Sequence, residues 1–136
     1  MSHQPQRMME INLLIQLTKA TSLGHDLFPE DKIEKSNDKT IYSVANGIKL
    51  QHNYTILQAS EGIAEVISIT ILISSNIALN MACNLASTYL YNKMEKHKDK
   101  VAGLLVRRKR TNNDPNDIAQ AFLQEIEELE KDENKL

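Results

Sequence analysis

The stretch IAEVISITILISSNIALNMACNLASTYLYNKM, residues 63–94, decides the fold because the apolar residues of the chain are concentrated there. Taken as a helix, it places most of its polar side chains on one narrow stripe. Small side chains recur at every fourth position on another face, at Ser74, Ala78, Ala82 and Ala86. Such a helix would be about 50 Å long at about 1.5 Å per residue, which exceeds the width of a domain of this size. The pattern therefore predicts a long, apolar central helix that meets a partner.

The first part of the same stretch has a second interpretation. Between Val66 and Ile73, isoleucines alternate with serine and threonine, and β-branched residues favour strands. Under this interpretation a strand is followed by a helix that is capped at Ser74 or Ser75. From Asn76 to about Lys96 both interpretations predict a helix.

Two segments before this stretch have strand patterns. Apolar residues alternate with mostly polar neighbours at Ile11, Leu13, Ile15 and Leu17, which predicts a strand over residues 10–18. Two apolar arms flank Asn46-Gly47, the dipeptide preferred in type I′ hairpin turns. The segment from Ser22 to Lys39 is rich in glycine, proline and charge, and is predicted to be a loop with one helical turn after Pro29.

The C-terminal third completes an α+β pattern. Val101 to Val106 predicts a strand that ends in the basic run Arg107-Arg108-Lys109-Arg110. Asp114 is a good N-cap, and Pro115 suits the first position of a helix. The buried side of that helix is expected at Ile118, Ala121, Phe122, Ile126 and Leu129. The prediction is one α+β domain over residues 1–136, with a small, mainly antiparallel sheet, an Asn-Gly hairpin, the central helix and a C-terminal helix. Residues 1–8 and 131–136 are expected to fray.

The overall charge balance hides an uneven distribution. The 136 residues carry a net charge of −2, which argues against a dedicated nucleic-acid binder. Residues 95–113, however, hold seven basic and two acidic side chains, and residues 114–136 hold two basic and eight acidic ones. A basic segment is therefore followed directly by an acidic helix.

The usual signatures of enzymes are missing from the sequence. The histidines, at positions 3, 25, 52 and 97, do not have the spacing of a helical metal site. A single cysteine excludes an internal disulfide, and Cys83 lies in a predicted helix, where a packed core thiol is expected. No catalytic, cofactor-binding or metal-binding residue is predicted, and the protein is expected not to be an enzyme. A loose site around His25 and Asp26 is the enzymatic alternative.

The expected compartment is the cytoplasm. The first residues form no signal-peptide pattern, and a lone cysteine suits a reducing environment. Within residues 63–94 no unbroken apolar run exceeds three residues, whereas a membrane-spanning helix needs about 20. The frequent isoleucine, asparagine and lysine residues point to an AT-rich bacterial or phage genome.

Two features suggest a binding surface on the central helix. The row of small residues allows close approach of a second helix, so a homodimer is predicted through Ser74, Ala78, Ala82 and Ala86. Asparagine is a mediocre helix former, yet it recurs at Asn76, Asn80, Asn84 and Asn92. These asparagines form either the exposed face of a buried helix or a polar ladder that sets the register of an oligomer.

A nucleic-acid contact is the alternative function. Arg107, Arg108, Lys109 and Arg110 form a compact basic patch that is suited to phosphates. Aromatic residues for base stacking are not interleaved with it. The competing explanation is that the basic strand end pairs with the acidic C-terminal helix.

The predicted order of elements resembles one group of known modules. A long helix over Ile63–Lys93, which ends in Tyr89-Leu90-Tyr91-Asn92-Lys93, is followed by a strand and helix over Val101–Leu129. This organisation, over about half the chain and without a diagnostic motif, resembles the small adaptor-type modules of bacterial conflict systems, also called effector-associated domains. The resemblance implies a non-enzymatic protein–protein interaction role with an unknown protein partner, and it carries over no site residues.

Overall fold

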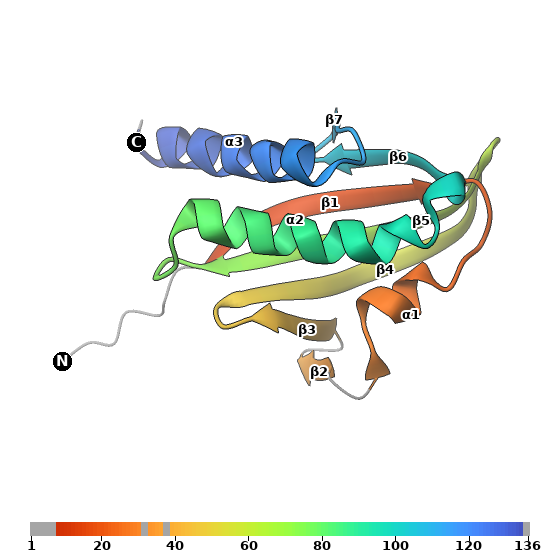
Figure 1. Ribbon diagram of the computed structural model, residues 1–136, viewed down its shortest axis with the longest axis horizontal. Helices are drawn as coiled ribbons and strands as arrows, with labels where there is room; N and C mark the ends of the chain where they lie inside the picture. Colours follow the sequence, from red (N-terminus) through yellow and green to blue (C-terminus); the bar gives the residue numbers. More distant parts are fainter. Residues whose placement is uncertain (1–7, 31–32, 37–38, 135–136) are drawn as a thin grey trace.

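The computed structural model describes residues 8–30, 33–36 and 39–134. Within these ranges the chain forms seven strands, three α-helices and a 3-10 helix (Figure 1). The elements are β1 (Met8–Leu17), α1 (Leu23–Leu27), β2 (Ile33–Ser36), β3 (Lys39–Ala45), β4 (Ile48–Ser60), β5 (Ile63–Ser74), α2 (Leu79–Glu95), η2 (Lys98–Lys100), β6 (Val101–Val106), β7 (Lys109–Arg110) and α3 (Pro115–Asn134).

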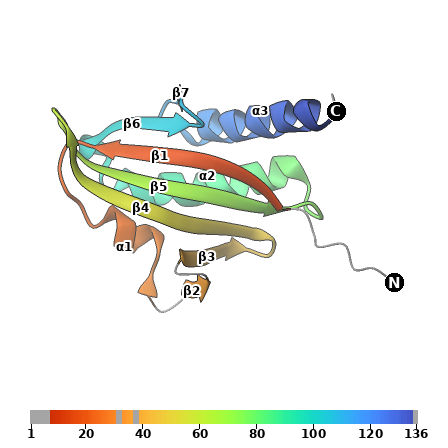
Figure 2. The same cartoon turned by 180° about the vertical axis from the view of Figure 1, so that it is seen from behind.

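All strands belong to one antiparallel sheet, in the order β2-β3-β4-β5-β1-β6-β7. The N-terminal strand β1 is therefore internal, with β5 on one side and β6 on the other. The helices α2 and α3 lie on one face of the sheet, and the view from behind shows the other face uncovered by them (Figure 2). The predicted α+β class with a mainly antiparallel sheet is confirmed.

Alternation along the central strands builds the core. The odd-numbered residues of β1 from Ile11 to Leu17 are buried under the helices, as are those of β5 from Ile67 to Ile73. The inward face of each strand contributes roughly 1.5–3 kcal/mol for every large aliphatic side chain that it buries. Ile118, Phe122 and Ile126 of α3 complete this core.

The prediction of one long helix over residues 63–94 is wrong, and the alternative of a strand followed by a helix matches the structure. Residues 63–74 form β5, and α2 begins only at Leu79 with Ala78 as its N-cap residue. The period-two pattern of isoleucines decides the conformation, because each inward isoleucine packs under the helices while its neighbours face away from them. Ser74 and Ser75 therefore do not cap the helix.

The hairpin between β3 and β4 differs from the predicted turn type. Ala45 pairs with Ile48, so Asn46 and Gly47 form the connection. Gly47 has φ +85°, but among the described non-glycine residues only Gln58, Arg107 and Arg108 have a positive φ. A type I′ turn needs positive φ at both central positions. That pattern occurs instead at Arg107-Arg108, in the turn between β6 and β7.

The segment predicted as a loop contains regular structure. The short helix α1 precedes Pro29, and β2 adds a strand at the edge of the sheet. Glu30, directly after Pro29, has a 3-10 conformation, and the rest of the predicted turn lies outside the described residues. Asp114 caps α3 as predicted, because its Oδ1 accepts hydrogen bonds from the backbone N–H groups of Asn116 and Asp117.

Fraying was predicted for residues 1–8 and 131–136, and the structure describes only some of these residues. Met8 is the first residue of β1, and α3 continues to Asn134, so residues 8 and 131–134 belong to regular elements. Residues 1–7 and 135–136 lie outside the described ranges. None of the described helices is long and apolar enough to span a membrane.

Candidate functional site

The predicted row of small residues does not form a surface. Ala82 and Ala86 are fully buried within the core of this chain, and Ser74 is the last residue of β5. Ala78 is exposed but precedes the helix. A partner helix therefore has no access to the row, because the row packs against the chain's own core.

The asparagines lie on the exposed side of the α2 region, opposite the buried Ala82 and Ala86. Asn80 and Asn84 of α2 are exposed, as is Asn76 in the turn before the helix. Two large apolar side chains share this outer side of α2: Met81 is 59% exposed and Leu85 is 42% exposed. The asparagines thus belong to the solvated face of a helix whose other side is buried.

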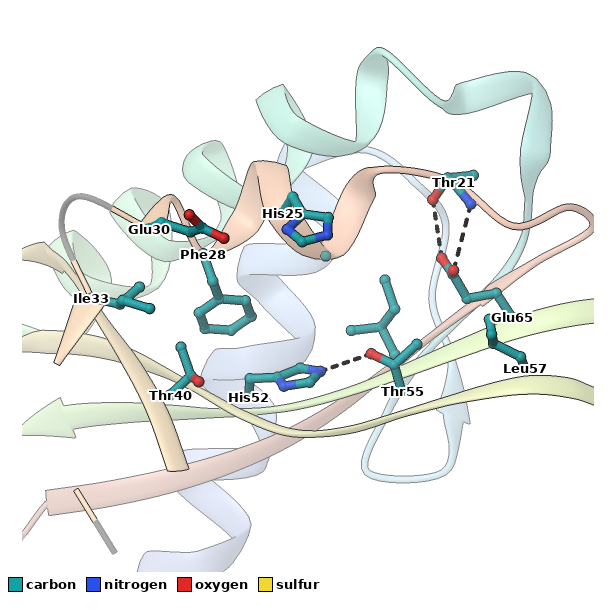
Figure 3. A pocket seen from close by; sticks show the side chains of 12 residues that line it. Thr21, His25, Phe28, Glu30, Ile33, Thr40, His52, Thr55, Leu57 and Glu65 are labelled. Atoms are coloured by element: carbon teal, nitrogen blue, oxygen red, sulfur yellow. Dashed lines mark hydrogen bonds between the residues drawn. The ribbon is translucent and has the colours of Figure 1, made fainter. Parts of the chain in front are cut away.

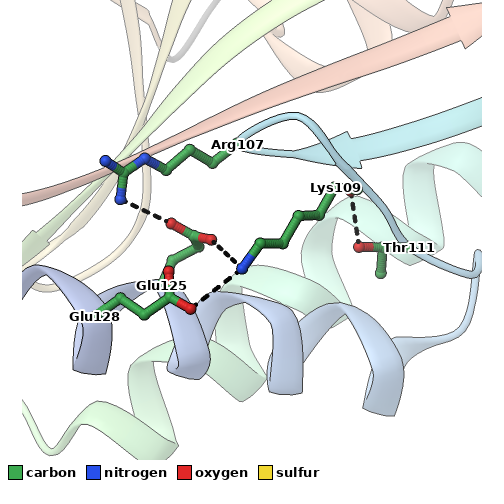
Figure 4. A network of polar contacts seen from close by, with 5 residues as sticks. All are labelled: Arg107, Lys109, Thr111, Glu125 and Glu128. Atoms are coloured by element: carbon green, nitrogen blue, oxygen red, sulfur yellow. Dashed lines mark hydrogen bonds and ion pairs between the residues drawn. The ribbon is translucent and has the colours of Figure 1, made fainter.

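Two residues of the basic run, Arg107 and Lys109, contact the acidic helix α3. Arg107 donates from Nη1 to Oε2 of Glu125 at 3.1 Å, and Lys109 Nζ lies 3.2 Å from Glu128 Oε1 and 3.7 Å from Glu125 Oε1 (Figure 4). Glu125 itself is buried. The basic end of β6 and β7 is therefore paired with the acidic helix α3.

The other two arginines have different surroundings. The guanidinium of Arg110 lies beside Gly103, where a Cβ added to this glycine would be 3.2 Å from Nη1. Arg108 is exposed, with φ +73°. Arg107 and Lys109 therefore contact α3, whereas Arg110 lies beside Gly103.

The neighbouring residues His25 and Asp26 make different contacts. His25 lines a cavity, whereas Asp26 pairs with His97. Asp26 Oδ2 lies 2.8 Å from Nε2 of His97, just after α2. Tyr89 of α2 donates its hydroxyl to the carbonyl of Leu27 at 2.7 Å. Burial raises the pKa of Tyr89, and the neighbouring Tyr42 and Asp26 raise it further. These contacts attach α1 to α2 and indicate a structural role for Asp26.

Cys83 is a core thiol. It is 2% exposed, and burial raises the pKa of the Cys83 thiol to about 11. A nucleophilic cysteine needs a lowered pKa, so this position is unsuited to nucleophilic chemistry. Among the described residues no group of three or more His, Cys, Asp and Glu side chains could hold a metal ion.

A cavity of about 520 Å³ lies between α1 and the sheet (Figure 3). It is lined by Thr21, Gly24, His25, Phe28, Glu30, Ile33, Thr40, His52, Thr55, Leu57, Glu65 and Ile67. The rings of Phe28 and His52 lie 5.4 Å apart, and His52 Nε2 is 2.7 Å from Thr55 Oγ1. Burial lowers the pKa of His52.

Glu65 is the cavity residue that the sequence did not single out. In the structure it occupies an inward position of β5 opposite Leu17 and is 5% exposed. An acidic residue at the odd-numbered, inward register of a buried strand was the signal that could have identified it.

Apart from the cavity, the far end of the β4–β5 hairpin is an exposed feature of the surface. Beyond His52, β4 has no strand partner other than β5 in the described part of the chain, and β1 pairs with β5 only up to Glu65. We call residues 53–64 the hairpin arm. In Figure 1 the tip of this arm extends beyond the ends of β1 and β6.

Comparisons with protein-family models, with curated proteins and with solved structures give no match. The functional argument for this chain therefore rests on the cavity, the exposed surfaces and the ion pairs described above.

Proposed function

We propose that this chain is a non-enzymatic protein–protein interaction module and that it forms a homodimer through the hairpin arm. The observation that carries the proposal is the exposure of three large apolar side chains within four successive positions. Tyr54 is 48% exposed, Ile56 46% and Leu57 62%. Such a concentration of exposed apolar surface is typical of an interaction site.

The backbone of the arm adds a second argument. A strand without a neighbour presents unpaired N–H and C=O groups, which readily pair with another strand. Register shifts occur between His52 and Tyr54 and again between Leu57 and Ser60. Bulges of this kind limit pairing, so the regular stretch Tyr54–Leu57 is the part of the edge that is available to a partner.

A second copy of the chain suits this edge. Residues 53–60 contain no charged side chain, so antiparallel pairing of the segment with itself brings no like charges together. A two-fold axis places the same surface on both partners. The contact is small, and small contacts bind weakly. We therefore expect a dimer that dissociates on dilution.

Light scattering over a wide concentration range, up to on the order of 1 mM, tests the proposal, because small interfaces are weak. The wild-type chain is expected to become dimeric at the upper end. Ile56→Lys places a charge at the centre of the contact and is expected to keep the chain monomeric. Met81→Lys, on the outer side of α2, is the matched control and is expected to leave the dimer intact.

Two results contradict this proposal in different ways. A wild-type chain that stays monomeric at every concentration removes the homodimer. Loss of the dimer in Met81→Lys but not in Ile56→Lys moves the interface to the outer side of α2, where Leu85 and the exposed asparagines also lie.

A nucleic-acid regulator acting through Arg107–Arg110 has less support. Arg107 and Lys109 already contact the carboxylates of α3, which reduces their charge available to phosphates. That alternative predicts salt-sensitive binding that is lost in the double variant Arg107→Glu, Arg108→Glu. Absence of binding by the wild-type chain at low salt eliminates it.

A further inference from the structure

The cavity beside α1 has the dimensions of a ligand site. Its volume of about 520 Å³ lies within the range of roughly 300–1,000 Å³ that is usual for small-molecule pockets. Its walls come from α1 and its flanking segments and from β2, β3, β4 and β5. Figure 3 shows the lining side chains gathered between the helix and the strands below it.

Glu65 gives the cavity an anionic group without a cationic partner among the described residues. Its Oε1 accepts a hydrogen bond from the hydroxyl of Thr21 at 3.0 Å, and the backbone N–H of Thr21 lies 3.5 Å from Oε2. None of the observed ion pairs includes it. A buried carboxylate is expensive unless a counter-charge compensates it.

The other lining residues strengthen the preference for a positive ligand. Glu30 contributes a second carboxylate, and among the described residues none that lines the cavity is a lysine or an arginine. Burial lowers the pKa of His52, so this ring stays neutral over a wider pH range and does not oppose a cation. The exposed His25 is the remaining titratable group in the lining.

The rest of the cavity is apolar. Phe28, Ile33, Leu57 and Ile67 supply hydrophobic walls. The carboxylate of Glu65 and the apolar walls together define the class of ligand. We infer that this cavity binds a small primary amine that carries an apolar or aromatic group. Its ammonium lies at Glu65 and its hydrocarbon part lies against Phe28. A metal ion does not fit, because the described residues offer no cluster of three metal-ligating side chains. The cavity shares Leu57 with the hairpin arm, but neither the amine site nor its test requires the proposed dimer.

An NMR titration of the full chain tests the site with three matched probes: 2-phenylethylamine, 2-phenylethanol and phenylacetate. The amine is expected to bind with a Kd on the order of 1 mM, as befits a ligand of this size. It should shift the resonances of Thr21, Phe28 and His52. The neutral and the anionic probe are expected to bind at least about tenfold more weakly, since they lack the charge-assisted contact.

Three variants separate the site from indirect effects. Glu65→Gln is expected to remove the preference for the amine. Gly24→Leu keeps Glu65 but fills space at the cavity wall, where a Cβ meets no atom within 4 Å, and it should weaken all binding there. Glu125→Gln changes another buried carboxylate, outside the cavity, and should leave amine binding unchanged.

The inference is overturned if the wild-type chain binds the amine no better than the alcohol. It is equally overturned if folded Glu65→Gln retains the wild-type preference, or if Gly24→Leu binds the amine as tightly as the wild type. Should Glu65→Gln not fold, Gly24→Leu alone decides the question, because its thermal unfolding can be compared with that of the wild type.

Discussion

Glu65 and Glu125 are both buried carboxylates, but their surroundings are opposite. Glu125 is 3% exposed and lies within hydrogen-bonding or ion-pairing distance of Arg107 and Lys109. Glu65 is 5% exposed, and its contacts are with the neutral Thr21. The comparison shows that burial of a charge alone does not identify a functional residue. The two carboxylates differ in whether a described basic side chain pairs with the buried charge.

Reversing the charge at Glu125 is expected to have the largest effect. Glu125→Lys places a third cation against Arg107 and Lys109 in a buried position, which should lower the free energy of unfolding by about 3–5 kcal/mol. Urea denaturation measures the loss. Glu128→Lys, at a side chain that is 51% exposed, is the control and should cost no more than about 1 kcal/mol. Equal losses would show that the burial of Glu125 does not matter.

Neutralising each carboxylate separates the two environments more directly. Glu125→Gln removes a charge-assisted hydrogen bond and should destabilise the chain by about 1.5–3 kcal/mol. Glu65→Gln removes a buried charge that has no ion pair within the described part of the chain, so stability should change by less than about 1 kcal/mol or increase. Urea midpoints of the two variants, measured side by side, test the contrast. If Glu65→Gln lost as much stability as Glu125→Gln, the proposed difference between the two carboxylates would be contradicted.

A double-mutant cycle between Arg107→Met and Glu125→Gln measures the ion pair itself. We expect a coupling energy of about 1 kcal/mol, because one partner is buried and the other is 48% exposed. The pair Lys109 and Glu128, with both side chains mostly exposed, should couple by only about 0.5 kcal/mol or less. Added salt should weaken the second coupling more than the first.

The smallest expected effect is a pH dependence from the cavity. Burial lowers the pKa of His52 in the folded chain, so the unfolded chain takes up the proton more readily. This contribution to stability is therefore present above the ordinary histidine value of 6.5 and is lost as the pH falls below it. Urea midpoints at pH values of about 7.5 and about 5.5 measure the loss.

The variant His52→Phe isolates this contribution. His25, Glu30 and Glu65 line the same cavity and are unchanged in the variant. The drop in stability on acidification should therefore be smaller in His52→Phe than in the wild type. An unchanged drop would assign the pH dependence to other groups.

The strands and the last helix could be predicted because their signals are local. Alternating burial from Ile11 to Leu17 and the Asp114-Pro115 cap both appear in the structure as the sequence indicates. Residues 63–74 were ambiguous, since their polar side chains fitted one stripe of a long helix while the isoleucines satisfied a strand pattern. Pairing of β5 with two long neighbours favours the strand, and no local pattern contains that information.

The candidate site depended on distant contacts and could not be predicted. Thr21 and Glu65 are 44 residues apart in the sequence, and only the fold brings their side chains together. The turn at Arg107-Arg108 is unpredictable for a different reason. Bulky residues rarely adopt a positive φ, so the sequence favoured Asn46-Gly47 for that conformation. The contact between Arg107 and Glu125 accompanies the unusual turn.

The internal position of β1 also has a consequence for how the chain reaches its fold. Met8 pairs with Ser74, and Leu13 pairs with Val106, so both neighbours of β1 are made long after it during synthesis. Until then its apolar side chains have no sheet to join. Pairings this remote in sequence make folding slow, because long loops must close before the contacts form. The apolar residues of β1 therefore stay unpaired, and prone to aggregate, until β5 has been synthesised, and the ladder between β1 and β6 closes only after Val106.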